Sequence, residues 1–252
     1  PDEPAPVRVL RGAGGADFLL TADHAGRAMP RRLGTLGLPI DQLERHIAWD
    51  IGIAGVTERL SAALDATAVL QAYSRLVIDC NRPPEVDSSI PSISETTPIP
   101  GNHDLDAGQR AARQREIFAP YHARIGQLLE ARVAAGRRTV LIAMHSFTPT
   151  FRGESRAMHV GVLYNRDPRL ARILLDLLRA DGDLVTGDNA PYRVSDVTDY
   201  TVPVHAERRG LAHAEIEIRQ DLIADETGQA AWARRFARLL AKADRRLREG
   251  EA

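Results

Sequence analysis

The sequence predicts a three-layer α/β/α sandwich around a mixed, mostly parallel sheet. Apolar runs of strand length alternate along the chain with segments in which apolar residues recur at helical spacing. One run, RTVLIAM at 138–144, is continuously apolar, as is typical of parallel strands buried on both faces. No repeat or linker interrupts the 252 residues, so we expect a single domain over residues 1–252.

The elements follow from these runs in chain order. Strands are expected at 16–20, at two places within 66–79, and at 138–144, 157–164, 183–187 and 211–219. Helices are expected at 43–64, 118–136, 168–180 and 226–249. The stretch at 83–108 begins rich in Pro, Ser and Thr and is too punctuated for a core element. We interpret it as a lid or substrate loop.

Composition argues against several classes of protein. A hydrophobic share of 44% with 27% charge is ordinary for a soluble globular protein, and a net charge of −1 favours neither nucleic-acid nor membrane partners. No apolar stretch reaches the roughly 18 residues of a membrane span. The single cysteine, Cys80, suits a reducing compartment, and PDEPAPVRVL lacks the pattern of a signal peptide. We therefore expect a cytoplasmic protein, with its oligomeric state left open.

Polar residues at the carboxyl ends of predicted strands point to a site, because ligands of open α/β sheets bind outside these ends. His24 follows FLLTAD, His145 follows VLIAM, and Asp79 and Asn81 follow RLVI. A lone polar residue in such a place is usually part of a turn. Two histidines and a carboxylate at several strand ends favour a site instead. The Ala–Gly pair after His24 would leave room for a metal and a substrate.

Two histidine nitrogens and one carboxylate oxygen, with an open fourth position, suit a catalytic Zn²⁺ or another divalent ion. The carboxylate is the open part of this prediction. His46 and Asp50 lie four apart on one predicted helix and would share a face. Asp50 then completes the metal site, orients a ligand histidine from outside, or belongs to an exposed pair. Asp23 is expected to point away from His24, and Arg27 occupies the place of Glu in a His-x-x-Glu pair.

The late strand LAHAEIEIRQ offers a general base. His213, Glu215 and Glu217 fall on one of its faces, which either meets water or looks over the site. In the second case Glu217 would deprotonate a water acidified by the metal.

Arginines near the site would bind an anionic substrate or polarise a carbonyl. The candidates are Arg75, Arg82, Arg152, Arg193 and Arg219. Asn189 and Tyr192, in the loop DNAPYRV, would add hydrogen bonds. Cys80 is a weaker candidate nucleophile, since a small buried cysteine is commoner. Ser146 lacks a Gly-x-Ser-x-Gly elbow, and no nucleotide-binding glycine motif is present.

These segments together resemble a known family. DHAG, HIAWDIG, SRLVIDCNR, MHS and HAEIEIRQDL, in that order, are similar to the N-formylglutamate amidohydrolases over about residues 17–240. DCNR and EIR also resemble elements of zinc carboxypeptidases and aspartoacylases. The resemblance implies a phosphorylase/hydrolase-like α/β fold and a zinc hydrolase of small anionic N-acyl amino acids.

The resemblance also implies roles for individual residues. It makes His24 and His145 metal ligands, Glu217 the base and Arg75 the carbonyl polariser. Asp50 is our expected third ligand, because Arg27 removes the usual acidic one. Substrate contacts are expected from Asn81, Arg82, Arg152, Asn189, Tyr192 and Arg193.

N-formyl-L-glutamate is the expected substrate, with formate and glutamate as products and histidine degradation as the setting. Two alternatives remain open at this point. One is a deacylase or carboxypeptidase-like hydrolase of another N-acyl amino acid. The other is a dicarboxylate-binding protein without catalysis on the same fold.

Overall fold

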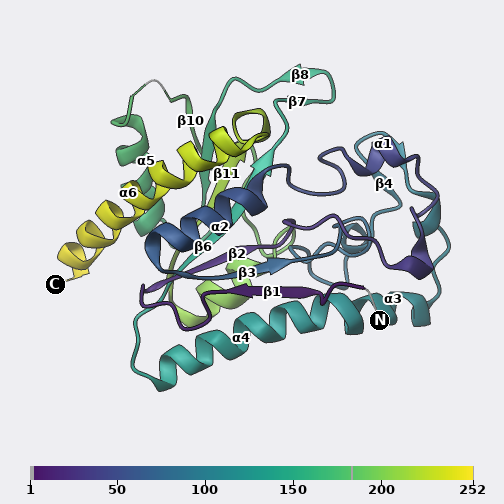
Figure 1. Cartoon of the computed structure of the whole chain (residues 1–252), viewed down its shortest axis with the longest axis horizontal. Helices are drawn as coiled ribbons and strands as arrows, with labels where there is room; N and C mark the ends of the chain where they lie inside the picture. The colour runs from purple at the N-terminus through teal and green to yellow at the C-terminus, as the bar shows by residue number, and fades with distance from the viewer. Residues whose placement is uncertain (1–2, 183, 252) are drawn as a thin grey trace.

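A seven-stranded mixed sheet forms the centre of the computed structural model, which describes residues 3–182 and 184–251 (Figure 1). In spatial order the strands are β1 (Val7–Leu10), β3 (Thr67–Gln71), β2 (Phe18–Ala22), β6 (Val140–Phe147), β11 (Ala212–Arg219), β9 (Val160–Leu163) and β10 (Thr186–Asp188). The four strands β3, β2, β6 and β11 run parallel, whereas β1 pairs antiparallel with β3 and β9 antiparallel with β11. The predicted mixed, mostly parallel sheet is confirmed.

Helices flank this sheet on both faces. The helices of the described residues are α1 (Ile40–Leu43), α2 (Ile53–Leu64), α3 (Ala107–Arg113), α4 (Ala119–Ala134), α5 (Arg169–Arg179) and α6 (Glu226–Glu251), of which α2, α4, α5 and α6 pack on the sheet. Helices α2, α5 and α6 pack apolar side chains such as Leu60, Leu174 and Phe236 on one face, and α4 covers the other with Tyr121 and Ile125 (Figure 1). The α/β/α layering is therefore as predicted. Within the described residues, none of the helices has the length and apolarity needed to cross a membrane.

Shorter elements complete the chain. Two small hairpins, β4 (Ile93–Ser94) with β5 (Thr97–Pro98) and β7 (Thr150–Phe151) with β8 (Glu154–Ser155), lie outside the central sheet. Single helical turns are found at Arg31–Leu33, Asp87–Ser89, Pro100–Asn102, Gln114–Phe118, Val202–Ala206, Glu207–Arg209 and Gln220–Leu222. The strand expected at 183–187 is β10, displaced toward the C-terminus. Residue 183 of that prediction lies outside the described residues.

The single helix expected at 43–64 is wrong. Helix α1 ends at Leu43, turns follow, and α2 begins only at Ile53. Gly52 makes this break, with φ at +80° and no room for a side chain, because an added Cβ would lie 2.1 Å from the Ile223 carbonyl oxygen. The 43–52 stretch keeps a helix-like spacing of apolar residues because Ile47 and Ala48 are buried in a turn.

The second strand expected within 66–79 is also wrong. Residues 74–79 form turns after β3, although Leu76, Val77 and Ile78 are fully buried there and imitate a strand in composition. The 83–108 segment is more ordered than a simple loop. It includes the β4–β5 hairpin, and Ile90 and Ile99 anchor it in the core. Its role as a lid stays a prediction.

A buried histidine pair joins α4 to the turn Val202–Ala206. His122 Nε2 donates to the Cys80 carbonyl oxygen at 2.8 Å, since a carbonyl can only accept. Neutral His122 therefore accepts at Nδ1 from His205 Nε2, 3.0 Å away. Burial lowers the pKa of His122 to about 4 and that of His205 to about 3. The fold thus requires both rings to be neutral.

This pair predicts an acid-sensitive contribution to stability. Below pH 6.5 these histidines are protonated in the unfolded chain but stay neutral in the folded protein. The free energy of unfolding therefore falls toward pH 4 by about 1.4 kcal/mol per pH unit for each ring. The variant His205→Gln keeps an N–H donor for His122 but does not titrate. Urea unfolding from pH 7 to 4.5 should show the variant gaining stability relative to wild type as pH falls. A pH-independent difference between the two proteins would contradict this account.

Candidate active site

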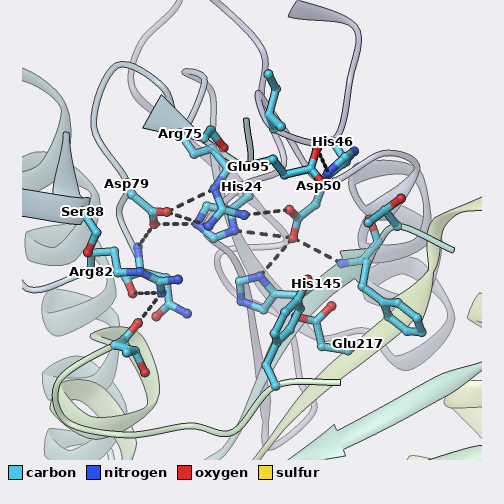
Figure 2. A pocket seen from close by; sticks show the side chains of 18 of the residues that line it. His24, His46, Asp50, Arg75, Asp79, Arg82, Ser88, Glu95, His145 and Glu217 are labelled. Atoms are coloured by element: carbon cyan, nitrogen blue, oxygen red, sulfur yellow. Dashed lines mark hydrogen bonds and ion pairs between the residues drawn. The ribbon is translucent and has the colours of Figure 1, made fainter. Parts of the chain in front are cut away.

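Three adjacent parallel strands bring the candidate residues to one edge of the sheet. His24 lies two residues beyond β2, His145 lies near the end of β6, and Glu217 lies near the end of β11. All three line a cavity of about 620 Å³ together with Asp50 (Figure 2). Its size is that of an ordinary small-molecule site. His24, His145 and Glu217 thus lie together at the carboxyl ends of neighbouring strands.

The Asp50 carboxylate lies between the two histidines. Its Oδ2 atom is 3.0 Å from His145 Nδ1 and 3.5 Å from His24 Nδ1 (Figure 2). One ligand atom from each residue lies within 4.8 Å of the others, and all three residues are buried. Burial alone would raise the pKa of the Asp50 carboxyl, but the two imidazoles hold it below its usual range. The structure brings together the three residues expected to bind metal.

Asp50 is positioned by hydrogen bonds in a turn, and not by the helix on which it was predicted to lie. Its backbone N–H donates to the His24 carbonyl oxygen at 2.9 Å, and its Oδ2 atom accepts from the Ser146 backbone N–H at 3.2 Å. His46 instead points to Glu95, with 3.3 Å between Nε2 and Oε2. The shared His46–Asp50 face is therefore wrong, because these residues lie in turns before Gly52.

Asp79 and Arg75, in the turns after β3, contact His24 and Asp50. Asp79 Oδ1 lies 2.7 Å from His24 Nε2, and Arg75 donates to Asp79 Oδ2 at 2.7 Å and 3.1 Å (Figure 2). Arg75 also donates to Asp50 Oδ1 at 3.4 Å. Burial would raise the pKa of Asp79, but Arg75 and then His24 hold it well below its usual range. Arg75 thus links two buried carboxylates at the cavity wall.

Asp23 and His24 make separate contacts, as expected of neighbours that point in different directions. Asp23 Oδ1 accepts from Tyr121 of α4 and its Oδ2 atom lies 3.5 Å from His145 Nε2, whereas His24 lies beside Asp50 and Asp79. The expectation that the Ala–Gly pair after His24 makes room for a ligand is wrong. An added Cβ on Gly26 would lie 2.0 Å from the Ala72 carbonyl oxygen, so this glycine allows close backbone packing.

The polar face of β11 is turned inward. His213, Glu215 and Glu217 are all buried, and the two glutamates line the cavity. Burial raises the pKa of Glu215 and of Glu217 to about 8. In each glutamate the Oε2 atom makes no hydrogen bond to another described residue. These carboxyl groups can therefore exchange protons near neutral pH.

The remaining candidates divide by position. Those that line the cavity are Asn81, Arg82, Arg152, Tyr192 and Arg193. Two expected contact residues that the structure describes, Asn189 and Arg219, do not line the cavity. Asn189 Oδ1 accepts from the Tyr164 N–H at 2.9 Å, and Arg219 pairs with Asp221 at 2.8 Å. Cys80 is fully buried, and burial raises the pKa of its thiol well above its usual range, which disfavours a nucleophile.

The family assignment follows from comparison with known proteins. A family model described as FGase, N-formylglutamate amidohydrolase, matches residues 16–224, which include every cavity residue named above. The chain belongs to the N-formylglutamate amidohydrolase family. Comparison with curated proteins gave no match.

The chain is also similar to solved structures. The chain is 42% identical to the gene product Atu2144 from Agrobacterium tumefaciens, with a TM-score of 0.94 and 97% of each chain covered. It is 18% identical to an N-formylglutamate amidohydrolase from Ralstonia eutropha JMP134, with a TM-score of 0.73 and coverage of 98% of this chain and 100% of the other. The second likeness shows a shared fold.

Sequence reasoning missed an aromatic wall in this family member. The Arg156 guanidinium lies 4.7 Å from the Phe151 ring centre and 4.9 Å from that of Tyr192. It also donates to Tyr192 Oη at 2.8 Å. Arg156 therefore fixes the Tyr192 ring at the cavity wall. The signal was weak, because Arg156 is one of many arginines outside any recognised motif.

Asn81 holds the segment that closes one side of the cavity. Its Oδ1 atom accepts from the backbone N–H groups of Tyr200 and Thr201 at 3.0 and 3.1 Å, and its Nδ2 atom donates to Asp199 at 3.1 Å. The side chain is buried, with 3% of the residue exposed. Its hydrogen bonds are thus committed mainly to the protein itself.

Asn81→Ala should lower the free energy of unfolding by about 2 to 4 kcal/mol, because two backbone donors and a carboxylate lose their partner. Asn165→Ala is the control, since its amide donates to the side chain of Glu207 at 3.1 Å at a half-buried site. That change should cost under about 1 kcal/mol. Chemical denaturation measures both, and equal losses would contradict the role given to Asn81.

Proposed function

We propose that the protein is a zinc-dependent amidohydrolase that cleaves the formamide bond of an N-formyl amino acid. The preferred substrate is N-formyl-L-glutamate. The observation that carries the proposal is the convergence of His24, Asp50 and His145 in a cavity of a member of this family. We place the reaction in the cytoplasm, in the degradation of histidine. Its substrate would be a small anionic amino-acid derivative, with neither nucleic acid nor membrane as partner.

The donor set fits zinc. Two imidazole nitrogens and one carboxylate oxygen, with room for a fourth ligand, are typical of catalytic zinc sites. Ligand bonds of about 2.0 to 2.1 Å in a tetrahedron separate two ligand atoms by roughly 3.3 Å. The Asp50–His145 and Asp50–His24 distances of 3.0 and 3.5 Å bracket this value. His24 Nδ1 is buried and makes no hydrogen bond to another described residue, so its lone pair is available.

The charge around the cluster also favours a cation. Asp23, Asp50 and Asp79 are buried about the two imidazoles, and Arg75 is the basic neighbour of Asp50 and Asp79. Buried carboxylates need positive partners, since each loses the solvation of water. A divalent ion would supply that charge without a proton.

The reaction needs a base, an electrophile and a proton donor. Zinc bound here would supply Lewis acidity that polarises the amide carbonyl and acidifies water. Glu217, on the adjacent strand, takes the proton of the attacking water and returns it to the leaving nitrogen. Arg75 donates to the oxygen on which negative charge develops. Formate and the free amino acid leave.

Substrate carboxylates would be held by the arginines of the cavity wall. Arg82 Nη1 donates to the backbone oxygens of Asn81 and Thr198, which fixes the guanidinium at the cavity wall. Arg152 and Arg193 are exposed lining residues and would add further contacts. Tyr192, fixed by Arg156, offers a hydroxyl.

Release of formate from N-formylglutamate by the zinc-loaded protein tests the proposal. A panel of formyl, acetyl and peptide substrates separates it from a deacylase or carboxypeptidase-like activity. Dicarboxylate binding without turnover on any of these substrates, with the metal site filled, would favour the non-catalytic alternative.

The first prediction from this proposal concerns the metal. Wild-type protein should bind about one Zn²⁺ per chain, and His24→Ala and His145→Ala should each lose it. His46→Ala is the matched control, because His46 lines the same cavity but lies apart from the cluster. Elemental analysis after dialysis gives the answer. Zinc retained at full occupancy in either alanine variant would remove that histidine from the ligand set.

The second prediction concerns the base. Glu217→Gln should keep zinc and the fold but lose formate release by about 10² to 10⁴-fold, because the amide cannot accept the water proton. Glu154→Gln, an exposed change outside the cavity lining, is the control and should keep wild-type rates. Turnover numbers at saturating substrate decide. Unchanged turnover in Glu217→Gln would contradict the assignment of Glu217 as the general base.

A further inference from the structure

We propose that Asp23 is the outer carboxylate that orients His145, and that Tyr121 and Thr201 hold Asp23 in this role. The inference rests on the proposed function, in which His145 is a metal ligand. It gives a role to three buried residues that take no part in the proposed reaction steps.

The hydrogen bonds of Asp23 are divided between its two oxygens. Oδ1 accepts from Tyr121 Oη at 2.7 Å and from Thr201 Oγ1 at 2.9 Å. Oδ2 makes no hydrogen bond to another described residue and lies 3.5 Å from His145 Nε2, which also makes none. Both hydroxyl donors thus fix the carboxylate through one oxygen and leave the other facing the imidazole.

The other histidine shows the same arrangement in a tighter form. His24 faces Asp50 with Nδ1 and Asp79 with Nε2, the latter at 2.7 Å. Asp79 in turn is fixed by Arg75 and by the Asn81 backbone N–H at 2.9 Å. Each imidazole therefore lies between the shared carboxylate of Asp50 and an anchored carboxylate of its own. Such outer carboxylates are the usual partners of metal-binding histidines.

The chemistry explains why His145 needs a partner at Nε2. An imidazole that offers Nδ1 to a metal must carry its proton on Nε2. Asp50 Oδ2, 3.0 Å from Nδ1, competes for that proton as an acceptor on the wrong side. A negative charge at Asp23 draws the proton to Nε2 and leaves the Nδ1 lone pair toward the cavity.

The supporting hydroxyls come from outside the cavity. Tyr121 belongs to α4, and Thr201 directly precedes the turn Val202–Ala206. Both are fully buried, and neither lines the cavity. Their removal should therefore act on His145 through Asp23, without opening the site to water or changing the substrate contacts.

Zinc affinity, measured by competition with a chromophoric chelator, tests the inference. Asp23→Asn should bind zinc about 10 to 100-fold more weakly than wild type, and Thr201→Val should show a smaller loss. Thr57→Val is the matched control, because it removes a buried hydroxyl that donates to the Ile53 carbonyl oxygen in α2. It should bind zinc as wild type does.

A second readout separates orientation from general stability. In long-range ¹H–¹⁵N spectra of the zinc-loaded protein, the Nε2 proton of His145 should be strongly deshielded by its carboxylate partner. Thr201→Val and Asp23→Asn should move this signal upfield, while the Nε2 proton of His24, bound to Asp79, serves as an internal reference and stays in place. Wild type alone already tests the predicted proton position if a variant does not fold.

The outcomes distinguish this inference from the function on which it rests. Failure of wild type to bind zinc would overturn both. Zinc binding by wild type with equal affinity in Asp23→Asn would overturn the role of Asp23 alone. Coordination of His145 through Nε2 would do the same, since the proton would then lie on the Asp50 side.

Discussion

The carboxylate of Asp50, buried between the imidazoles of His24 and His145, is the constraint on which the rest of the site depends. A charged group at that depth is stable only when fixed donors surround it. The Ser146 backbone N–H and the two imidazoles surround Oδ2, and Arg75 donates to Oδ1. Gly52 follows because the chain must turn sharply after Asp50 to enter α2.

The parallel sheet explains how residues far apart in sequence share this small space. Strands β2, β6 and β11 are neighbours, so His24, His145 and Glu217 meet at one edge although almost two hundred positions separate the first from the last. The turn that carries Asp79 and Asn81 then closes the site from the side. Asn81 ties it to residues 199–201, so this wall of the cavity is assembled by hydrogen bonds between turns.

The sheet, the layers and the strand-end histidines could be predicted from the sequence, because buried strands and helices each have a characteristic spacing of apolar residues. The sequence could not give the partners of side chains beyond a strand end. Asp23 was expected only to point away from His24, and its contacts with Tyr121, Thr201 and His145 depend on elements that strand alternation does not locate. Likewise the burial of Val77 and Ile78 in turns resembles a strand, since apolar content records burial and says nothing of hydrogen bonding.

The buried carboxyl groups fall into two kinds, and their partners account for the difference. Asp23, Asp50 and Asp79 each accept from fixed donors and lie beside an imidazole, and the pKa of each is held low despite burial. Glu215 and Glu217 have an oxygen without such a partner, and burial raises the pKa of each to about 8. The first kind can hold geometry because it keeps its charge. The second can gain and lose a proton near neutrality, which is the property that a general base for amide hydrolysis requires.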